Sequence, residues 1–456
     1  MVVEDRPDRS AHPAGSLPPW AVVILVAAVM LHVAMMGSLF WGYLDQLFYA
    51  SDRVWQALDF FSTYEAGHKA LQGVSVYKFD PFFQSDSERA PYYSAYRYVP
   101  VFAYGFGAPM NALSPWNAYW GWVACNELLL VLNAYGTWRL GGKTAWAAVG
   151  AAMWFVFTPY YVEMYQGQFS FLMATLLFWA AAGLMQRREL FAGASWGVSL
   201  IAKSNSIVLA PVFLRVMWWR AIALSIGLVA LNVPYFISRT SDLEYFWRAS
   251  ANDMYREQTL RPLLYTAADQ GLLAMIENVI LTVNETAANV PHALSLSLAP
   301  AIVLVSLAVT FLARNPDRLL LFSMWVSTFF LFHGWVPEYH YVMLLPVFVM
   351  LVVHRPALRA PALIAYVALA LPTPYWLVNH VWNTAPILAP KIVDSLQASW
   401  PEWGVVLHHA AKPVPTLLLW AWLMVVQCRA GLGFEWLTEQ RDAALRAFRA
   451  AEDLPA

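Results

Sequence analysis

A single lysine, Lys203, stands inside a stretch that otherwise has the composition of a membrane segment. Basic residues flank this stretch, 190–217, on both sides: Arg187, Arg188, Arg215 and Arg220. Because cytoplasmic loops of membrane proteins carry an excess of positive charge, we expect residues 190–217 to cross the membrane and return, with Lys203 at the far turn. Ionisable groups at membrane depth are costly and usually functional. At that turn, the ammonium group could bind a phosphate at the external surface of the membrane.

An acidic residue, Asp59, is the main candidate for a general base. Apolar residues at helical spacing predict an amphipathic helix over residues 52–72, lying on the membrane surface: Val54, Leu58 and Phe61. Ser51 or Asp52 can cap its start and Gly73 can end it. Asp59 lies at the edge of the apolar face, where a carboxylate could accept a proton from a substrate hydroxyl. A solvated surface acid is the competing interpretation, and the first loop offers other acids: Asp52, Asp80, Asp86 and Glu88.

Polar residues at other predicted external positions could complete a binding site. Gln168 follows Gly167 at a predicted helix start, a place suited to anion binding. Glu338 and His340 follow another turn and could bind sugar hydroxyls or phosphate, and Arg97 supplies a cation. Each has a simpler interpretation, as a plain turn, a satisfied interface histidine or a solvated charge. The predicted topology nevertheless places an acid, cations, an amide and an imidazole on one face of the membrane.

Other charged residues of the external loops are weaker candidates. Three arginines of the predicted loop 239–291 supply further cations: Arg248, Arg256 and Arg261. Two histidine-containing groups raise the idea of a metal site: His380 with Asp394, and the adjacent His408 and His409. Neighbouring histidines do not easily share one ion, so this interpretation is disfavoured. The sequence implies no cofactor and leaves a divalent metal open.

The composition identifies the class of protein. Of the 456 residues, 60% are hydrophobic and 12% are charged, whereas soluble domains carry about 25% charged residues. The chain also has 23 Trp and 22 Tyr, residues that favour the membrane interface. We therefore expect an all-α polytopic membrane protein. A net charge of −1 argues against nucleic acid as a partner, and the two cysteines give neither a metal motif nor a disulfide framework.

About twelve transmembrane helices are predicted from the apolar segments. They are expected at residues 20–40, 116–137, 145–162, 168–186, 190–202, 205–217, 221–238, 292–312, 319–335, 340–353, 361–379 and 413–427. With the N-terminus inside, every short basic loop is cytoplasmic, provided that 190–217 is a hairpin and that 98–113 does not cross. The segment 98–113 is short and contains Pro and Gly, so we expect it to lie on the surface or to re-enter the membrane.

This topology divides the chain into regions. Residues 1–19 form a cytoplasmic tail, and the apolar run after it is an anchor rather than a removed signal peptide. Three long loops are external, and the first of them carries the membrane-surface helices: 41–115, 239–291 and 380–411. Residues 430–456 are expected to form a cytoplasmic amphipathic tail.

Short motifs spread over residues 50–350 give the chain a family resemblance. They are Asp59-Phe60, Leu71-Gln72-Gly73, Val76-Tyr77, Tyr98-Val99-Pro100, Ala108-Pro109, Gly167-Gln168, Ala192-Gly193, Gly197, Lys203, His340-Tyr341 and Leu344-Leu345-Pro346. In this order and spacing they resemble glycosyltransferase family 87, the polyprenyl-phosphate-mannose-type enzymes of the GT-C superfamily. The chain departs from the family pattern where Tyr-Pro-Pro becomes Tyr98-Val99-Pro100 and where Lys-Pro becomes Lys203-Ser204.

The resemblance implies a GT-C fold, with a catalytic transmembrane module at 20–354 and additional C-terminal helices at 355–429. It implies an inverting glycosyltransferase of the bacterial inner membrane that takes a sugar from a polyprenyl-phosphate donor at the external face. Mannose is the family's usual sugar, arabinofuranose is the alternative, and the acceptor would be a glycolipid or glycan. Asp59 would be the catalytic base. The phosphate and sugar of the donor would be bound by Lys203, Gln168, His340, Arg97 and Glu338.

Two other classes of function compete with this one. A lipid or small-molecule transporter or flippase would place ionisable residues near the bilayer midplane, often in two related halves. Here the predicted spans are almost free of charge, the acids lie in external loops, and no internal repeat is visible. A non-catalytic scaffold would be expected to lose Asp59 or Lys203, and both are present. The enzyme is therefore the preferred hypothesis.

Overall fold

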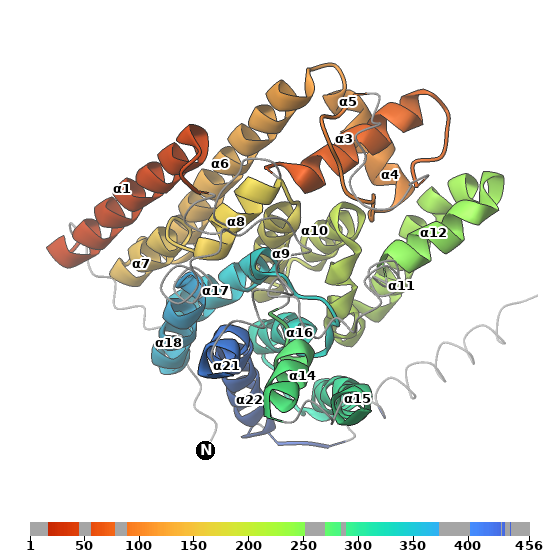
Figure 1. Cartoon of the computed structure of the whole chain (residues 1–456). Helices are drawn as coiled ribbons and strands as arrows, with labels where there is room; N and C mark the ends of the chain where they lie inside the picture. Colours follow the sequence, from red (N-terminus) through yellow and green to blue (C-terminus); the bar gives the residue numbers. More distant parts are fainter. Residues whose placement is uncertain are drawn as a thin grey trace, which may run out of the picture.

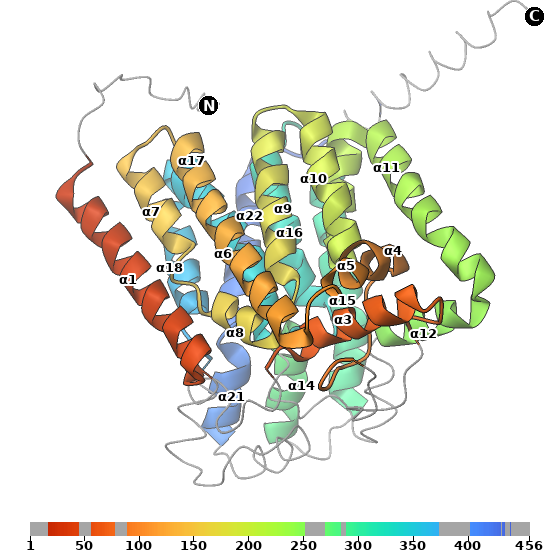
Figure 2. The same cartoon turned by 90° about the horizontal axis from the view of Figure 1, so that it is seen from above.

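The computed structural model describes residues 17–44, 56–77, 89–250, 270–283, 289–373, 402–429, 431–433 and 438. Within these residues the protein is helical, and the one strand-like contact among them is an isolated bridge between Ala313 and Leu432. The helices form a bundle, as Figures 1 and 2 show from two directions. This agrees with the predicted all-α class. Most of the predicted tails 1–19 and 430–456 and most of the predicted loop 380–411 lie outside the described residues.

The N-terminal helices follow the predicted segments with one exception. They are α1 (Pro19–Trp41), α6 (Pro115–Leu140), α7 (Ala145–Met153), α8 (Thr158–Gln166), α9 (Ser170–Met185) and α10 (Glu189–Ala202). The predicted span 145–162 lies within Ala145–Gln166, a helical stretch long and apolar enough to cross a membrane, but its helix is interrupted between α7 and α8. Pro159 lies in the first turn of α8. Proline restricts the residue before it and lacks an amide hydrogen, so it opens a new helix more readily than it continues an old one.

The structure contains the predicted hairpin with Lys203 at its turn. α10 ends at Ala202, and Lys203 has an extended backbone with φ −158° and ψ 114°. The chain then returns through the short helix η3 (Ser204–Leu209) and the first part of α11 (Ala210–Ser238). The two arms pack through Trp196 and Phe213, whose rings stack with centroids 4.4 Å apart. The lysine thus stands where two apolar arms meet.

The C-terminal half adds further helices to the bundle. α11 is interrupted at Met217, where φ is −150° and ψ is 49°, close to the predicted boundary between the segments 205–217 and 221–238. The following elements are α12 (Thr240–Ser250), α14 (Leu272–Val283), α15 (Asn289–Leu312), α16 (Arg318–Phe332), η5 (Glu338–Leu344), α17 (Leu345–His354), η6 (Pro356–Leu358), α18 (Arg359–Ala370), α21 (Glu402–Ala410) and α22 (Pro413–Arg429).

Four helical stretches in the described part of the chain are long and apolar enough to cross a membrane: Pro19–Trp41, Ala145–Gln166, Ser204–Ser238 and Val406–Arg429. Shorter apolar helices, including α9, α10 and α16, pack among them. These lengths support a membrane protein. The total of twelve spans and the GT-C fold stay predictions, since several helices are shorter than the ~20 residues that a straight crossing needs.

Basic turns gather at one end of the bundle. Arg220 and Arg318 both pair with Glu189, at 3.1 and 3.5 Å, which joins the α9–α10 connection to α11 and α16. Nearby, Arg355 at the end of α17 pairs with Asp317 at the start of α16. Figure 2 shows α3 (Leu58–Leu71) lying across the bundle toward the opposite end. The basic turns and α3 therefore lie at two different ends of the bundle.

Helix α3 is more enclosed than the predicted surface helix 52–72. It begins at Leu58, after Ala57 with a φ of 64°, and Gly73 with a φ of 70° follows its end. Ser51 and Asp52, the predicted caps, lie outside the described residues. Every residue from 60 to 67 is buried. Amphipathic spacing within the helix could not reveal this, because the covering surface comes from distant parts of the chain.

Part of that cover is the short element expected not to cross the membrane. It consists of α4 (Pro100–Phe102), a π-helical turn η2 (Ala103–Gly107) and α5 (Ala108–Met110). A Cβ atom on Gly107 would collide with the carbonyl oxygen of Thr63, and one on Gly67 would collide with the backbone of Gly107. The two glycines therefore allow this element, which we call the 100–110 element, to touch the backbone of α3.

Aromatic packing fixes the turn between α8 and α9. Phe169 is fully buried there. Its ring centroid lies 5.0 Å from Phe102, 5.1 Å from Phe106 and 4.9 Å from Trp122. Aromatic pairs at such distances contribute about 0.5–1.5 kcal/mol each beyond burial of area. The turn that carries Gln168 is consequently held by the 100–110 element and by α6.

Candidate active site

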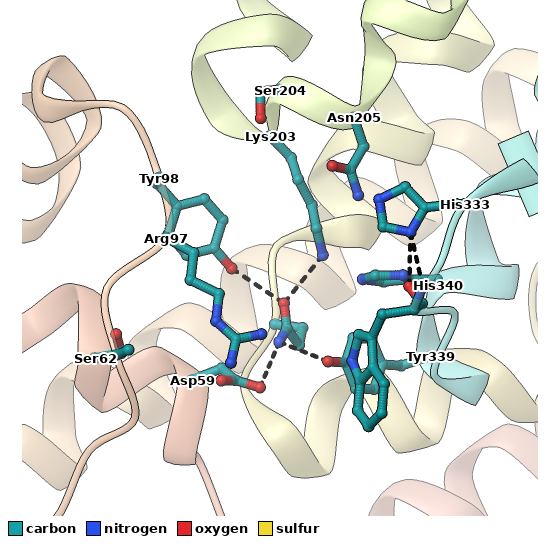
Figure 3. A pocket seen from close by; sticks show the side chains of 13 residues that line it. Asp59, Ser62, Arg97, Tyr98, Lys203, Ser204, Asn205, His333, Tyr339 and His340 are labelled. Atoms are coloured by element: carbon teal, nitrogen blue, oxygen red, sulfur yellow. Dashed lines mark hydrogen bonds between the residues drawn. The ribbon is translucent and has the colours of Figure 1, made fainter. Parts of the chain in front are cut away.

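A cavity lies between α3, the α8–α9 turn, the end of α10 and the segment before α17 (Figure 3). Its lining residues are Asp59, Ser62, Ala95, Arg97, Tyr98, Gln168, Lys203, Ser204, Asn205, His333, Trp335, Tyr339 and His340. Five of the six predicted site residues are in this set: Asp59, Lys203, Gln168, His340 and Arg97. Tertiary folding thus brings together side chains from five separate segments of the chain.

The amide of Gln168 connects the acid and the lysine of the cavity. Its oxygen accepts hydrogen bonds from Lys203 Nζ at 3.1 Å and from the Tyr98 hydroxyl at 3.0 Å. Its nitrogen donates to Asp59 Oδ2 and to the Tyr339 hydroxyl. An ammonium group can only donate and a carboxylate accepts, so the orientation of the amide follows from its neighbours. All four hydrogen-bonding positions of the side chain are in use.

The backbone around Gln168 explains how the amide reaches this position. Gly167 has a φ of 66°, which glycine adopts without strain. A Cβ atom there would lie 2.6 Å from Cβ of Phe60 on α3. Gly167 therefore supplies both the turn and the close approach to α3, whose preceding residue Ala57 donates its N–H to Tyr165 O at 2.7 Å.

Asp59 is held in the first turn of α3 with both oxygens engaged. Oδ1 accepts from the Ser94 hydroxyl at 2.8 Å, and Oδ2 accepts from Gln168. Carboxylates are stabilised at helix N-termini by the helix dipole. Among the lining residues that the structure describes, Asp59 is the one carboxylate. It is thus an oriented acceptor in a cavity that otherwise offers cations, imidazoles and hydroxyls.

Lys203 is buried yet reaches the cavity. Its side chain is 8% exposed, and Nζ donates to Ser170 Oγ at 2.6 Å as well as to Gln168. The ammonium nitrogen also lies 5.6 Å from the ring centroid of Tyr339, a cation–π distance. Burial lowers the pKa of Lys203 to about 8, and the acids Glu163 and Asp59 oppose that shift. The side chain is still mainly cationic at neutral pH.

The remaining predicted residues of the cavity are a cation, Arg97, and an imidazole, His340. His340 is 6% exposed, and in the described part of the chain its Nδ1 has no hydrogen-bond partner. Figure 3 shows Arg97 above Asp59, with His340 on the other side of the Lys203 side chain. A polar atom without a partner in a buried position usually indicates a missing ligand or water. An anion or a sugar hydroxyl would satisfy it.

Sequence reasoning missed several residues in or beside the cavity. Tyr98, Tyr339 and Ser94 bind Gln168 or Asp59 directly, and His333 and Asn205 also face the cavity. Two signals pointed to the tyrosines: both are neighbours in sequence of Arg97 or His340, and Tyr98 begins the Tyr98-Val99-Pro100 motif. Burial raises the pKa of Tyr98 far above its ordinary range, so its hydroxyl stays protonated and keeps donating to Gln168.

Glu338 is not brought into the cavity. Its carboxylate points to the opposite side of η5, where it pairs with Lys412 at 3.2 Å. Eight other acids, arginines and histidines considered from the sequence lie outside the described part of the chain: Asp52, Asp80, Asp86, Glu88, Arg256, Arg261, His380 and Asp394. His408 and His409 are buried in α21. Among the described residues, no group of three or more His, Cys, Asp or Glu is placed to hold a metal ion.

The comparison with protein families is consistent with this geometry. The model of Glycosyltransferase family 87 matches residues 96–334, just over half of the 456 residues. The matched range contains Arg97, Gln168 and Lys203 and leaves out Asp59 and His340. A search of curated proteins finds no match.

Proposed function

This chain belongs to glycosyltransferase family 87, and on that premise we propose that it is an inverting transferase acting on a lipid-linked sugar. The family makes it a membrane glycosyltransferase. We infer that the donor is a polyprenyl-phosphate sugar and that the acceptor is a hydroxyl of a glycolipid or glycan. The reaction would take place at the external face of a bacterial inner membrane.

One observation carries the proposal: Asp59 and Lys203 line the same cavity and are bridged by one amide. A base and a leaving-group cation must act on the two sides of one anomeric carbon. The Gln168 amide lies between the Asp59 carboxylate and the Lys203 ammonium group, and its hydrogen bonds hold both side chains in fixed orientations. Basic turns mark the cytoplasmic side of a membrane protein. Neither Asp59 nor Lys203 lies at the basic end of the bundle, which supports a reaction at the external face.

The bond changes follow from these positions. The acceptor oxygen attacks the anomeric carbon, and its proton passes to the Asp59 carboxylate. The bond from that carbon to the phosphate oxygen breaks on the opposite side, and its electron pair leaves with the phosphate, which gives inversion. Lys203 and His340 stabilise the departing phosphate, and Arg97 adds positive charge. Ser94 and Gln168 keep the carboxylate oriented toward the acceptor.

A phosphate monoester donor is favoured by the charge of the cavity. A polyprenyl phosphate is a poorer leaving group than a nucleoside diphosphate, so catalysis needs localised positive charge where negative charge develops. Lys203 and Arg97 supply it, and Asp59 is the one acid among the described lining residues. We propose mannose as the sugar, with arabinofuranose as the alternative that the same assay decides.

The experiment is a transfer assay with the purified full-length protein and a panel of polyprenyl-phosphate sugars, with the product identified by mass spectrometry. A general base contributes about 10²–10⁴-fold to the rate, so Asp59→Asn should reduce transfer by that factor and leave binding of farnesyl phosphate intact. Glu65→Gln is the matched control. Glu65 is a buried acid on the same helix that accepts from the Ala90 N–H at 3.2 Å and does not line the cavity.

Near-normal turnover by Asp59→Asn would exclude Asp59 as the base. Equal losses in Asp59→Asn and Glu65→Gln would show that α3 had been disturbed rather than the chemistry. Transport of the donor across a vesicle membrane without product formation would instead support the transporter hypothesis.

A further inference from the structure

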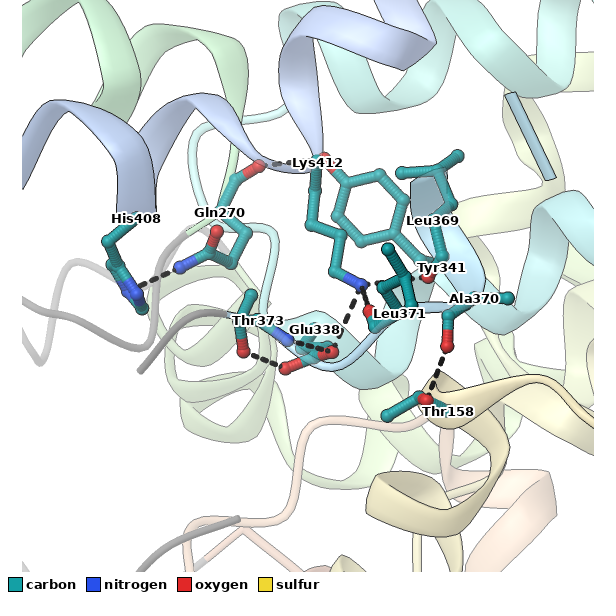
Figure 4. Close-up of polar contacts among 10 residues, drawn as sticks. All are labelled: Thr158, Gln270, Glu338, Tyr341, Leu369, Ala370, Leu371, Thr373, His408 and Lys412. Carbon is teal, nitrogen blue, oxygen red and sulfur yellow. Dashed lines mark hydrogen bonds and ion pairs between the residues drawn. The ribbon is translucent and has the colours of Figure 1, made fainter. Parts of the chain in front are cut away.

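The carboxylate of Glu338 is bound on the side of η5 that faces away from the cavity. Figure 4 shows Lys412 and Thr373 around it. Lys412 Nζ lies 3.2 Å from Oε1, the Thr373 N–H donates to Oε1 at 3.3 Å, and the Thr373 hydroxyl donates to Oε2. The next two residues along the chain, Tyr339 and His340, line the cavity. One short helix therefore carries an ion pair on one face and site residues on the other.

Lys412 joins this helix to two other elements. It lies just before α22, and its ammonium group donates to Leu369 O at 2.7 Å and to Leu371 O at the end of α18. Its side chain is 1% exposed, and that of Glu338 is 11% exposed. Cations are favourable near helix C-termini. The lysine is thus fully enclosed among η5, α18 and α22.

A second set of contacts holds the same segment from the same side. The Gln270 N–H donates to Val336 O at 2.8 Å, and the Tyr341 hydroxyl donates to Gln270 O at 2.7 Å. The Gln270 side chain in turn lies 2.6 Å from His408 Nε2 on α21. On the side away from the cavity, the segment 336–341 is therefore held by Gln270 and Lys412, and His408 in turn holds Gln270.

We propose that Lys412 is a positioning residue, which binds Glu338 and thereby fixes Tyr339 and His340 against the phosphate site of the donor. This inference rests on the proposed function. It assigns a role to α21 and α22, which lie outside the matched range 96–334.

The local structure makes such support necessary. η5 is a 3₁₀ helix, and helices of that type have poorer hydrogen-bond geometry and are short. The Tyr339 hydroxyl accepts a hydrogen bond from the Gln168 amide at 3.1 Å, so the position of η5 sets this contact. His340 must keep an imidazole nitrogen directed toward the ligand. Displacement of η5 by a fraction of an ångström would weaken both contacts.

The test measures the dissociation constant of farnesyl phosphate for the full-length protein in nanodiscs. Lys412→Met should weaken binding about tenfold, the equivalent of one hydrogen bond to a charged group. Arg355→Met is the matched control, since it breaks the Asp317–Arg355 ion pair at the far end of α17 and should leave the affinity unchanged. Lys203→Met reports on the proposed function itself and should also weaken binding.

A double variant, Glu338→Gln with Lys412→Met, separates positioning from stability. It leaves no unpaired buried charge, so its thermal midpoint should return toward that of the wild type. We expect its affinity for farnesyl phosphate to stay weakened, because η5 has lost its connection to α18 and α22.

Each result has one meaning. Wild-type affinity in the double variant, or in a folded Lys412→Met variant, overturns the positioning role, provided that Lys203→Met still weakens binding. If Lys203→Met also binds normally, the proposed phosphate site fails. If Lys412→Met does not fold, the double variant decides.

Discussion

Replacement of Lys203 by methionine tests the part of the site on which the proposed chemistry depends most. Methionine keeps an unbranched apolar side chain and removes the charge together with the hydrogen bonds to Ser170 and Gln168. The side chain is 8% exposed, so little water can take the place of the ammonium group.

Two estimates of the effect agree. A unit charge about 4 Å from a phosphate charge contributes about 4 kcal/mol at an effective dielectric constant of about 20. Loss of one donor that stabilises developing charge costs about 10²–10³ in kcat, or about 2.7–4 kcal/mol. We therefore expect Lys203→Met to lower kcat by about 10²–10³-fold.

The assay is the initial rate of sugar transfer by purified protein at saturating donor, with Lys69→Met as a control. Lys69 lies on α3, where it binds the Tyr93 hydroxyl at 3.3 Å, and it does not line the cavity. A rate for Lys203→Met within about threefold of the wild type would refute the role of this charge, since it leaves less than about 0.7 kcal/mol for the interaction.

The pH dependence supplies an independent check of the same residue. Burial lowers the pKa of Lys203 to about 8, and the cationic form is the one that stabilises phosphate. The value of kcat/KM should therefore be retained below pH 8 and fall as the pH rises through about 8. Tyr98 does not titrate there, because its pKa is raised. Arginine stays protonated, so a fall that persists unchanged in Lys203→Arg would assign it to another group.

Two further predictions concern the elements that position the site. Gln168→Glu replaces the amide donor that faces Asp59 with an oxygen. The loss of a hydrogen bond to the Asp59 carboxylate and the repulsion between the two carboxylates should lower the transfer rate about 10–100-fold. An unchanged rate would show that the Gln168 bridge is dispensable. Gly107→Ala should lower the thermal midpoint, because its methyl group meets the carbonyl oxygen of Thr63 and overpacking costs about 1–3 kcal/mol. Gly105→Ala, in the same 100–110 element but with open space around it, is the control, and equal midpoints would contradict the close approach.

Several features followed from the sequence alone. Composition and apolar segments predicted a helical membrane protein, and flanking basic residues predicted the hairpin with Lys203 at its turn. Short motifs predicted the family, and two residues of those motifs, Gln168 and His340, line the cavity. These inferences succeed because hydrophobic burial and charge placement act on the composition of each segment, which can be read locally.

Other features depended on contacts between distant segments. The break before Pro159 could be predicted in principle, but the burial of α3 from residue 60 to 67 requires knowledge of what covers it. The four hydrogen bonds of Gln168 join residues from four other parts of the chain. Glu338 shows the limit most clearly, because its sequence neighbours Tyr339 and His340 face the cavity while its own side chain turns to Lys412. Residue type and spacing identify groups capable of chemistry, but the direction in which a side chain points is decided by packing between helices, which is a property of the tertiary structure.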